Sequence, residues 1–253
     1  MNRDLAWDGC HNVRDLGGLP ATGGRRTRWK AVVRSDTPDR LTPAGWAAAT
    51  AHGVRTILDL RRPGEHRAEP GHRPPGMTVV RVPLDLPGDP DVHLYRGTPL
   101  YLRPQMDRWP DRCAAALRVI AEAPPGGVLV HCVAGRDRTG LITLLLLALA
   151  GVAEPDILAD YELSAARLRP LYALLGQPDD DLRVRGHLTR AGTTTPEVIM
   201  TLLDGLDIEE YLRAGGLTTA ELALLRERLT VVDEGGGEDA GVVVTVEDRG
   251  GAA

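Results

Sequence analysis

The chain contains no phenylalanine, and aromatic residues make up only 4% of its 253 residues. Its core must therefore be built from Leu, Val, Ala and Ile, and aromatic platforms on which nucleic-acid bases could stack are scarce. A formal net charge of −5 also argues against a general binder of nucleic acid or of anionic membranes. We expect a globular protein that does not have nucleic acid as a partner.

Cysteine is also rare. The three cysteines, Cys10, Cys113 and Cys132, are an odd number at wide spacing, which fits neither a disulfide framework nor a paired-cysteine zinc pattern. No cluster of His and carboxylate ligands indicates a metal site, so we expect no metal and no other cofactor. Cys10 and Cys113 have no electropositive neighbourhood in the sequence and are predicted to be inert thiols.

Long apolar runs are missing. The run over 141–150 is ten residues long, whereas about 20 are needed to cross a bilayer, so it predicts a buried core helix. The first residues contain no apolar stretch of signal-peptide length. We expect a cytoplasmic protein without integral membrane association, and the sequence says nothing of its oligomeric state.

Apolar β-branched runs alternate with helical patterns along the chain. This alternation predicts an α/β fold, with a central, largely parallel sheet flanked by helices. Strands are expected at 31–33, 54–60, 78–82 and 128–131. Helices are expected at 43–52, 100–122, 141–150, 155–168, 196–203 and 218–229, with Pro110 kinking or splitting the second of them.

One domain is predicted over 1–231. Within it, the stretch between Pro170 and Thr195 is polar and irregular. The pattern leaves open whether this stretch belongs to a helical lid over about 170–215 or forms an ordinary surface loop. The acidic, Gly-rich segment 232–253 is predicted to be a disordered tail.

The reactive chemistry is concentrated in His131-Cys-Val-Ala-Gly-Arg-Asp-Arg-Thr-Gly140, which lies between an apolar strand and the apolar helix. In such a strand–loop–helix unit, backbone N–H groups and the helix dipole converge on one anion. Cys132 would lie at the base of this cradle, whose field stabilises a thiolate able to attack phosphorus. Arg138 would turn its guanidinium fork toward two oxygens of a bound phosphoryl group.

The whole loop is expected to bind the substrate's phosphoryl group. Gly135 permits a close approach or a positive φ. Thr139 either donates a hydrogen bond to the thiolate or serves as a helix N-cap or first-turn residue, and His131 has at most a supporting role. The predicted binding residues are Val133, Ala134, Gly135, Arg136, Asp137, Arg138 and Thr139.

Two aspartates compete as the general acid that protonates the leaving oxygen. Asp85 follows a predicted strand in a proline-bracketed loop, and Asp137 lies inside the phosphate loop. Asp85 could equally be a turn residue, and Asp137 could equally be a hydrogen-bond acceptor that braces the loop. We favour Asp137, because its place in the loop keeps it near the leaving oxygen, whereas Asp85 depends on loop closure.

HCVAGRDRTG resembles the active-site pattern of the protein tyrosine phosphatase superfamily. The resemblance extends over about 10–230 and is carried also by NVRDLGG at 12–18, VRSD at 33–36, TILDLR at 56–61 with Glu65, and Asp160-Tyr161 with Ser164. These segments look like the bacterial branch, which includes enzymes active on phosphoserine, phosphothreonine and phosphoinositides. The resemblance implies a single phosphatase domain with that fold, which hydrolyses phosphomonoesters through a cysteinyl-phosphate intermediate.

Phosphotyrosine is the substrate that the resemblance favours, on a phosphorylated protein or a small phosphomonoester. The branch commonly has Lys-Asp before the arginine, whereas this chain has Arg136-Asp137. Arginine keeps the charge but not the point-charge geometry of lysine, so lipid activity is left open. A catalytically silent phosphate-binding module is the alternative function. We favour the enzyme, because Cys132, Arg138 and an acid candidate are all present.

Several charged groups outside the loop are expected to be structural. Arg14 and Asp15 could form an ion pair that braces the loop, but a turn built on a glycine pair is favoured. Asp59, Arg61 and Glu65 predict a charge network at a strand end with no part in function. The basic segment 25–30 is expected to form a solvated hairpin edge.

Overall fold

A five-stranded sheet lies at the centre of the computed structural model, which describes residues 1–65, 73–89 and 97–233. Its strand order is β1-β4-β7-β5-β6, with β1 antiparallel to β4 and the other neighbours parallel. The predicted α/β fold with a largely parallel sheet is therefore confirmed. The strands are β1 (Arg14–Asp15), β4 (Val32–Ser35), β5 (Val54–Asp59), β6 (Thr78–Arg81) and β7 (Gly127–His131).

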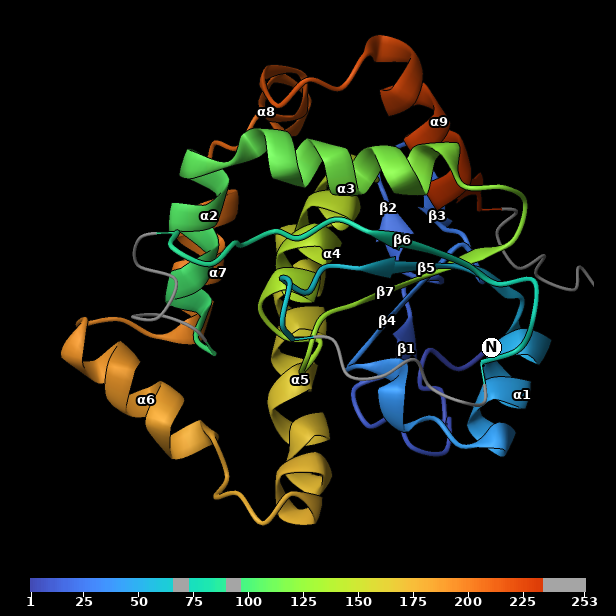
Figure 1. Ribbon diagram of the computed structural model, residues 1–253. Coiled ribbons are helices and arrows are strands. Elements are labelled where there is room, and N and C mark those ends of the chain that lie inside the picture. The colour runs from blue at the N-terminus through green and yellow to red at the C-terminus, as the bar shows by residue number, and fades with distance from the viewer. Residues whose placement is uncertain (66–72, 90–96, 234–253) are drawn as a thin grey trace, which may run out of the picture.

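Alternate residues of the buried strands supply two separate cores. On β4, Val33 packs with α1 (Pro43–His52), whereas Val32 belongs to the larger cluster on the other face. The larger cluster includes α3 (Pro110–Glu122), α4 (Arg138–Leu149) and α9 (Thr219–Leu229). Figure 1 shows α1 and α3 on opposite sides of the sheet. Because helices cover both faces of the sheet, a ligand site is expected at the ends of its strands.

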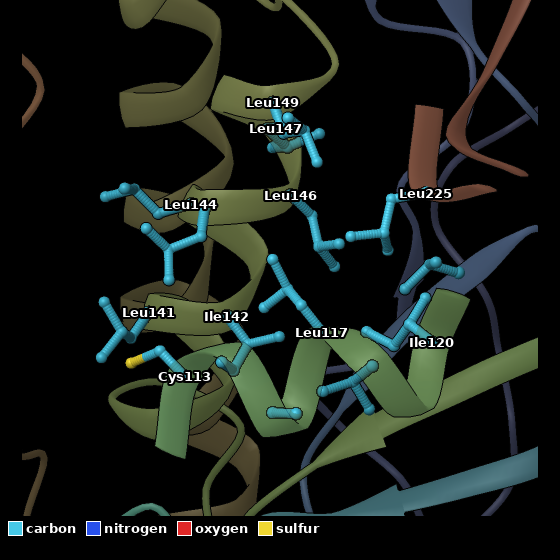
Figure 2. Close-up of a cluster of buried hydrophobic side chains, with 14 of the residues drawn as sticks. Cys113, Leu117, Ile120, Leu141, Ile142, Leu144, Leu146, Leu147, Leu149 and Leu225 are labelled. Carbon is cyan, nitrogen blue, oxygen red and sulfur yellow. The ribbon is translucent and has the colours of Figure 1, made fainter. Parts of the chain in front are cut away.

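The α4 helix is buried around its whole circumference, as the sequence predicts. All of its residues except Ala148 are buried. Leu146 lies near Leu225 of α9, and Ile142 lies beside Leu117 of α3 (Figure 2). No helix within the described ranges is long and apolar enough to cross a membrane. Because α4 is packed on all sides, its first turn and the loop before it are held in a fixed position.

Most predicted helices are present. Thr42 caps α1 by accepting from the Gly45 N–H, and Gly53 ends it at φ 106°. The expected interruption at Pro110 separates α2 (Leu102–Arg108) from α3. Short 3₁₀ turns, η1 (Pro38–Arg40) and η2 (Pro99–Tyr101), precede α1 and α2. The predicted C-terminal helices correspond to α7 (Thr195–Leu203) and α9.

Of the two alternatives for the stretch between 170 and 195, the ordinary surface loop is wrong, because most of the stretch is helical, and the lid stays a prediction. Here α5 (Glu154–Leu174) continues through Pro170, and α6 (Asp181–Arg190) follows. Val184 and Leu188 of α6 are buried four residues apart, which supplies a short apolar stripe on an otherwise polar helix. A further helix, α8 (Ile208–Ala214), has no counterpart among the predictions.

A second sheet, of three strands, pairs a segment near the N-terminus with the last strand of the described chain. Its order is β2 (Pro20–Ala21), β3 (Arg25–Thr27) and β8 (Thr230–Val232). The basic segment is therefore a central strand and not the expected edge, because β8 pairs with it. Residue 232, the first of the expected tail, belongs to β8, and the Asp233 N–H donates to the Gly24 carbonyl at 2.9 Å. The remaining residues of the predicted tail, 234–253, lie outside the described residues.

Candidate active site

The predicted strand–loop–helix unit is present at the carboxyl ends of the parallel strands. Strand β7 ends at His131 and α4 begins at Arg138, so that 132–137 form the phosphate loop. Cys132 is only 3% exposed at the start of this loop. The Thr37 N–H, after the end of β4, donates to the Val133 carbonyl at 2.9 Å. Ligands of open parallel sheets bind at this edge.

Two buried side chains hold the phosphate loop from behind. Asn12 Nδ2 donates to the carbonyls of Ala134 at 3.0 Å and Gly135 at 3.1 Å. Arg34 Nη2 donates to the same Gly135 carbonyl at 2.8 Å. Because a trans peptide is planar, an N–H points opposite to the carbonyl that precedes it. The N–H groups of Gly135 and Arg136 therefore face the other side of the loop, where an anion can bind.

Gly135 has the positive φ that was anticipated, at 68°. A Cβ at this position would lie 2.2 Å from the Ser35 carbonyl oxygen. The loop therefore lies directly on the end of β4, and a larger residue would push it away. Glycine is required here for both conformation and space.

Asp160 of α5 is the centre of the network behind the loop. Its carboxylate accepts from Arg14 Nε at 3.0 Å and Arg34 Nη1 at 2.6 Å, and it also contacts Arg3. Burial raises the pKa of Asp160, but these arginines outweigh it and lower the pKa well below its usual range. Arg14 also donates to Asn12 Oδ1 at 2.7 Å. One carboxylate thus fixes both side chains that hold the loop.

Arg14 does not pair with Asp15. The Asp15 carboxylate instead accepts from the N–H groups of Gly17 at 2.7 Å and Lys30 at 2.9 Å, and it lies 2.6 Å from His52 Nε2. The favoured interpretation, a structural turn, holds for Asp15. For Arg14 this interpretation is wrong, because Arg14 braces the phosphate loop by binding Asp160 of α5. Residue spacing does not reveal this contact, since α5 is far from Arg14 in the sequence.

Arg138 lies among carboxylates at the mouth of the loop. Its Nη1 is 2.5 Å from Glu65 Oε2 and 3.3 Å from Asp85 Oδ1. Burial lowers its pKa, but the charges of Cys132, Glu65 and Asp85 outweigh burial and raise it. The expectation that Glu65 is only part of a strand-end network is therefore wrong, since it contacts the predicted phosphate clamp.

The rest of that network is structural, as expected. Arg61 donates from Nε and Nη2 to Asp59 at 2.9 Å each, and from Nη1 to Asp39 at 2.5 Å. His131 is buried, with Nδ1 3.0 Å from the Cys132 carbonyl oxygen. Burial lowers the pKa of His131, which keeps the ring neutral near pH 7.

Both candidate acids lie at this site. Asp85 is fully buried, between Arg138 and the Tyr101 hydroxyl, which is 3.5 Å from its Oδ2. Asp137 Oδ2 accepts from the Gly97 N–H at 2.9 Å. Asp137 Oδ1 is buried and has no hydrogen-bond partner among the described residues. This oxygen lies 3.5 Å from Arg136 Nε, so the guanidinium of Arg136 is its ion-pair partner.

Thr139 and Arg136 were also expected to contact the phosphoryl group. The Thr139 hydroxyl, in the first turn of α4, is buried and has no hydrogen-bond partner within the described ranges. Arg136 Nη2 donates to Asp180 Oδ2 at 2.7 Å, just before α6. The described residues contain no group of three or more His, Cys, Asp or Glu that could hold a metal ion.

Comparison with known proteins identifies the family. The profile of the tyrosine phosphatase family matches residues 5–231. The chain belongs to the tyrosine phosphatase family. A proposed tyrosine-protein phosphatase of Cupriavidus necator is 38% identical over 173 residues, which cover 62% of each chain.

Two other similar proteins are more distant. The triple specificity protein phosphatase PtpB of Mycobacterium tuberculosis is 28% identical over 186 residues, 60% of this chain and 66% of its own. The chain in a crystal structure of a P. aeruginosa TpbA variant in complex with phosphotyrosine has 17% sequence identity to this chain, with a TM-score of 0.43. The alignment covers 86% of this chain and 100% of the TpbA chain. The aligned part of this chain spans about three-fifths of the Cupriavidus relative's length.

Proposed function

We propose that this protein hydrolyses phosphomonoesters, with phosphotyrosine favoured, through a cysteinyl-phosphate intermediate at Cys132. The observation that carries the proposal is the loop itself. Its carbonyls are bound from behind by Asn12 and Arg34, which turns successive N–H groups toward one face. Cys132 and the Arg138 fork lie at the two ends of the same loop. This arrangement suits a nucleophile that attacks a bound phosphoryl group.

Two steps follow from the proposed roles. The Cys132 thiolate attacks phosphorus, an S–P bond forms, the P–O bond to the leaving group breaks, and Asp137 gives its proton to the leaving oxygen. Asp137 then takes a proton from water, which attacks phosphorus, breaks the S–P bond and releases phosphate. Arg138 orients two phosphoryl oxygens throughout. Asp137 is proposed over Asp85 because Asp85 is enclosed between Arg138 and Tyr101.

The substrate range is also a proposal. The name of PtpB describes a triple specificity, so phosphoserine, phosphothreonine and phosphoinositides belong in any substrate panel. In this chain Arg136 is bound to Asp180, which reduces the charge it offers to a lipid head group. Three free thiols also suit a reducing compartment, and we propose a cytoplasmic location.

The test is turnover of nitrophenyl phosphate and of a phosphotyrosine peptide in the presence of a chelator. We expect Cys132→Ser to abolish turnover while the variant still binds the peptide, and Cys10→Ser to be active. Full activity of Cys132→Ser would overturn the mechanism. Wild-type protein that binds the peptide but does not hydrolyse it would instead support the silent phosphate-binding module.

A further inference from the structure

Two arginines, two aspartates and a glycine form a closed ring of contacts beside the phosphate loop. Arg136 Nη2 donates to Asp180 Oδ2 at 2.7 Å, and Arg183 Nε donates to Asp180 Oδ1 at 2.5 Å. Arg183 Nη2 also donates to the Gly97 carbonyl at 3.5 Å. The Gly97 N–H donates to Asp137 Oδ2, and Asp137 Oδ1 lies 3.5 Å from Arg136 Nε. The ring therefore leads from the proposed general acid to Asp180 in both directions.

The carboxylate of Asp137 is held by groups outside α4. Asp137 occupies the N-cap position of this helix, where an aspartate commonly accepts from N–H groups of the first turn, but its side chain makes no such bond. The carboxylate is bound instead to Gly97 and Arg136. A long arginine side chain has many rotamers, so Arg136 can hold Asp137 only where its own guanidinium is fixed.

Asp180 fixes this guanidinium. It lies just before α6, and its two oxygens accept from both arginines of the ring, with Arg183 Nη2 2.9 Å from Oδ2. Burial raises the pKa of Asp180, but the hydrogen bonds from Arg183 and Arg136 outweigh burial and lower it, so the carboxylate is ionised at neutral pH. Arg136 is only 8% exposed, so water screens this ion pair poorly.

The ring is closely packed around Gly97. A Cβ on this glycine would lie 2.2 Å from Arg183 Nη2 and 2.9 Å from Arg136 Nη2. Both guanidinium groups therefore lie against the backbone whose N–H binds Asp137. A change at Asp180 that released either arginine would also loosen Gly97, and both partners of the Asp137 carboxylate would lose their order.

We propose that Asp180 is a positioning residue that directs the carboxyl of Asp137 toward the leaving oxygen. It acts through the two partners of that carboxyl, Arg136 and Gly97. A displacement of about 1 Å at a reacting group can cost about a hundredfold in rate. The inference rests on the proposed phosphatase function, with Asp137 as its acid. Protonation of the leaving group would then depend on the start of α6, a helix outside the phosphate loop.

The test is the leaving-group dependence of Asp180→Asn. Asparagine keeps the shape of the side chain but has one acceptor oxygen, and its NH₂ group would face a guanidinium, so one arginine must leave. We expect kcat/KM to fall about tenfold on an alkyl phosphate, less than for Asp137→Asn, because the acid is displaced and not removed. The loss on nitrophenyl phosphate, whose anion needs little protonation, should be much smaller. Asp179→Asn is the matched control, because Asp179 pairs with the exposed Arg169 outside the ring.

A double variant separates positioning from a general loss of structure. If Asp180 acts through Asp137, then Asp180→Asn should cost nothing further on the alkyl phosphate in the Asp137→Asn background. A merely structural role would lower the rates on both esters alike and would add to the effect of Asp137→Asn. Equal losses on the two esters, or an additive double variant, would overturn the inference.

The outcomes separate this inference from the proposed function. Leaving-group dependence in Asp137→Asn but not in Asp180→Asn would remove only the positioning role. The absence of that dependence in Asp137→Asn would remove Asp137 as the acid and the positioning role with it, and would leave Cys132 as the nucleophile. Wild-type protein that hydrolyses no phosphomonoester would remove the proposed function as well.

Discussion

Arg138 holds Glu65 through both terminal nitrogens, with Nη1 2.5 Å from Oε2 and Nη2 3.3 Å from Oε1. Burial raises the pKa of Glu65, but Arg138 outweighs burial and lowers it, so the carboxylate stays ionised and fixes the plane of the fork. We expect Glu65→Gln to reduce kcat/KM for aryl phosphates about ten- to a hundredfold, which corresponds to one charge-assisted hydrogen bond of about 1.5–3 kcal/mol.

Glu122→Gln is the matched control, because Glu122 is exposed at the end of α3. The measurement is steady-state kinetics with inorganic phosphate as a competitive inhibitor. An increase in kcat/KM for Glu65→Gln would show that Glu65 competes with the substrate for Arg138 and does not orient it.

Asn12 allows a test of the phosphate loop without touching the nucleophile. Asn12→Ala removes two donors to loop carbonyls, so the N–H groups on the other face lose their fixed direction. We expect the inhibition constant of inorganic phosphate to rise about tenfold, in keeping with hydrogen bonds of about 1 kcal/mol each. Asn2→Ala is the control, because Asn2 lies on the surface. Unchanged phosphate affinity in Asn12→Ala would show that the loop holds its shape unaided.

The three thiols should differ in reactivity. Burial raises the pKa of Cys10 well above its usual value, and burial raises the pKa of Cys113 to about 11. Both therefore stay protonated at neutral pH, and iodoacetamide should label Cys132 first, as followed by mass spectrometry. Added phosphate should slow that labelling. Faster labelling at Cys10 would contradict the assignment of the reactive thiol.

The two aspartates can be separated by the leaving group. A general-acid variant should lose more rate on an alkyl phosphate than on nitrophenyl phosphate, whose anion needs little protonation. We expect Asp137→Asn to lose about a hundredfold or more on the alkyl ester, within the range usual for general acids, and much less on the aryl ester. If only Asp85→Asn shows this dependence and loses the basic limb of the pH profile, Asp85 is the acid.

Asp160 should make stability depend on acid pH. Its folded pKa is lowered, so its contribution is fully present above the unfolded value of about 3.9 and is lost as pH falls through the folded pKa. Asp160→Asn should lower the free energy of unfolding by about 3–5 kcal/mol at pH 7, because it leaves buried arginines unpaired. As pH falls below about 4 the difference between the two proteins should shrink, and it should vanish only below the folded pKa of Asp160.

Urea unfolding at several pH values measures this difference. Asp156→Asn, on the same helix, is the control. Parallel pH curves for wild type and Asp160→Asn would show that the arginines find other partners.

The sequence predicts the phosphate loop well because its chemistry is local. A strand, six loop residues and a helix follow one another, so Cys132 and Arg138 are placed by chain order alone. The roles of Glu65, Asn12 and Asp160 depend on contacts between distant segments, which spacing does not encode. Glu65 is 73 residues from Arg138, and Asp160 is 146 from Arg14.

The helices after α4 show a second limit. The sequence around α6 has two buried apolar residues, Val184 and Leu188, among exposed charges. That pattern is too sparse to distinguish a helix from a loop, because tertiary packing supplies the stability that propensity lacks. Pro170 misleads in the same way, since it lies on an exposed part of α5 and the helix continues past it.

Asp160 and Tyr161 are consecutive residues of α5. Asp160 holds Arg34 behind the phosphate loop, and the Tyr161 ring lies against Gly140 in the first turn of α4. A helix turns by about 100° per residue, so a small rotation of α5 would move both side chains together. A substitution that shifts α5 would therefore disturb the back of the loop and the start of α4 at the same time. During evolution, a change in the packing of α5 would have to be accompanied by compensating changes in Arg14 and Arg34, which bind Asp160.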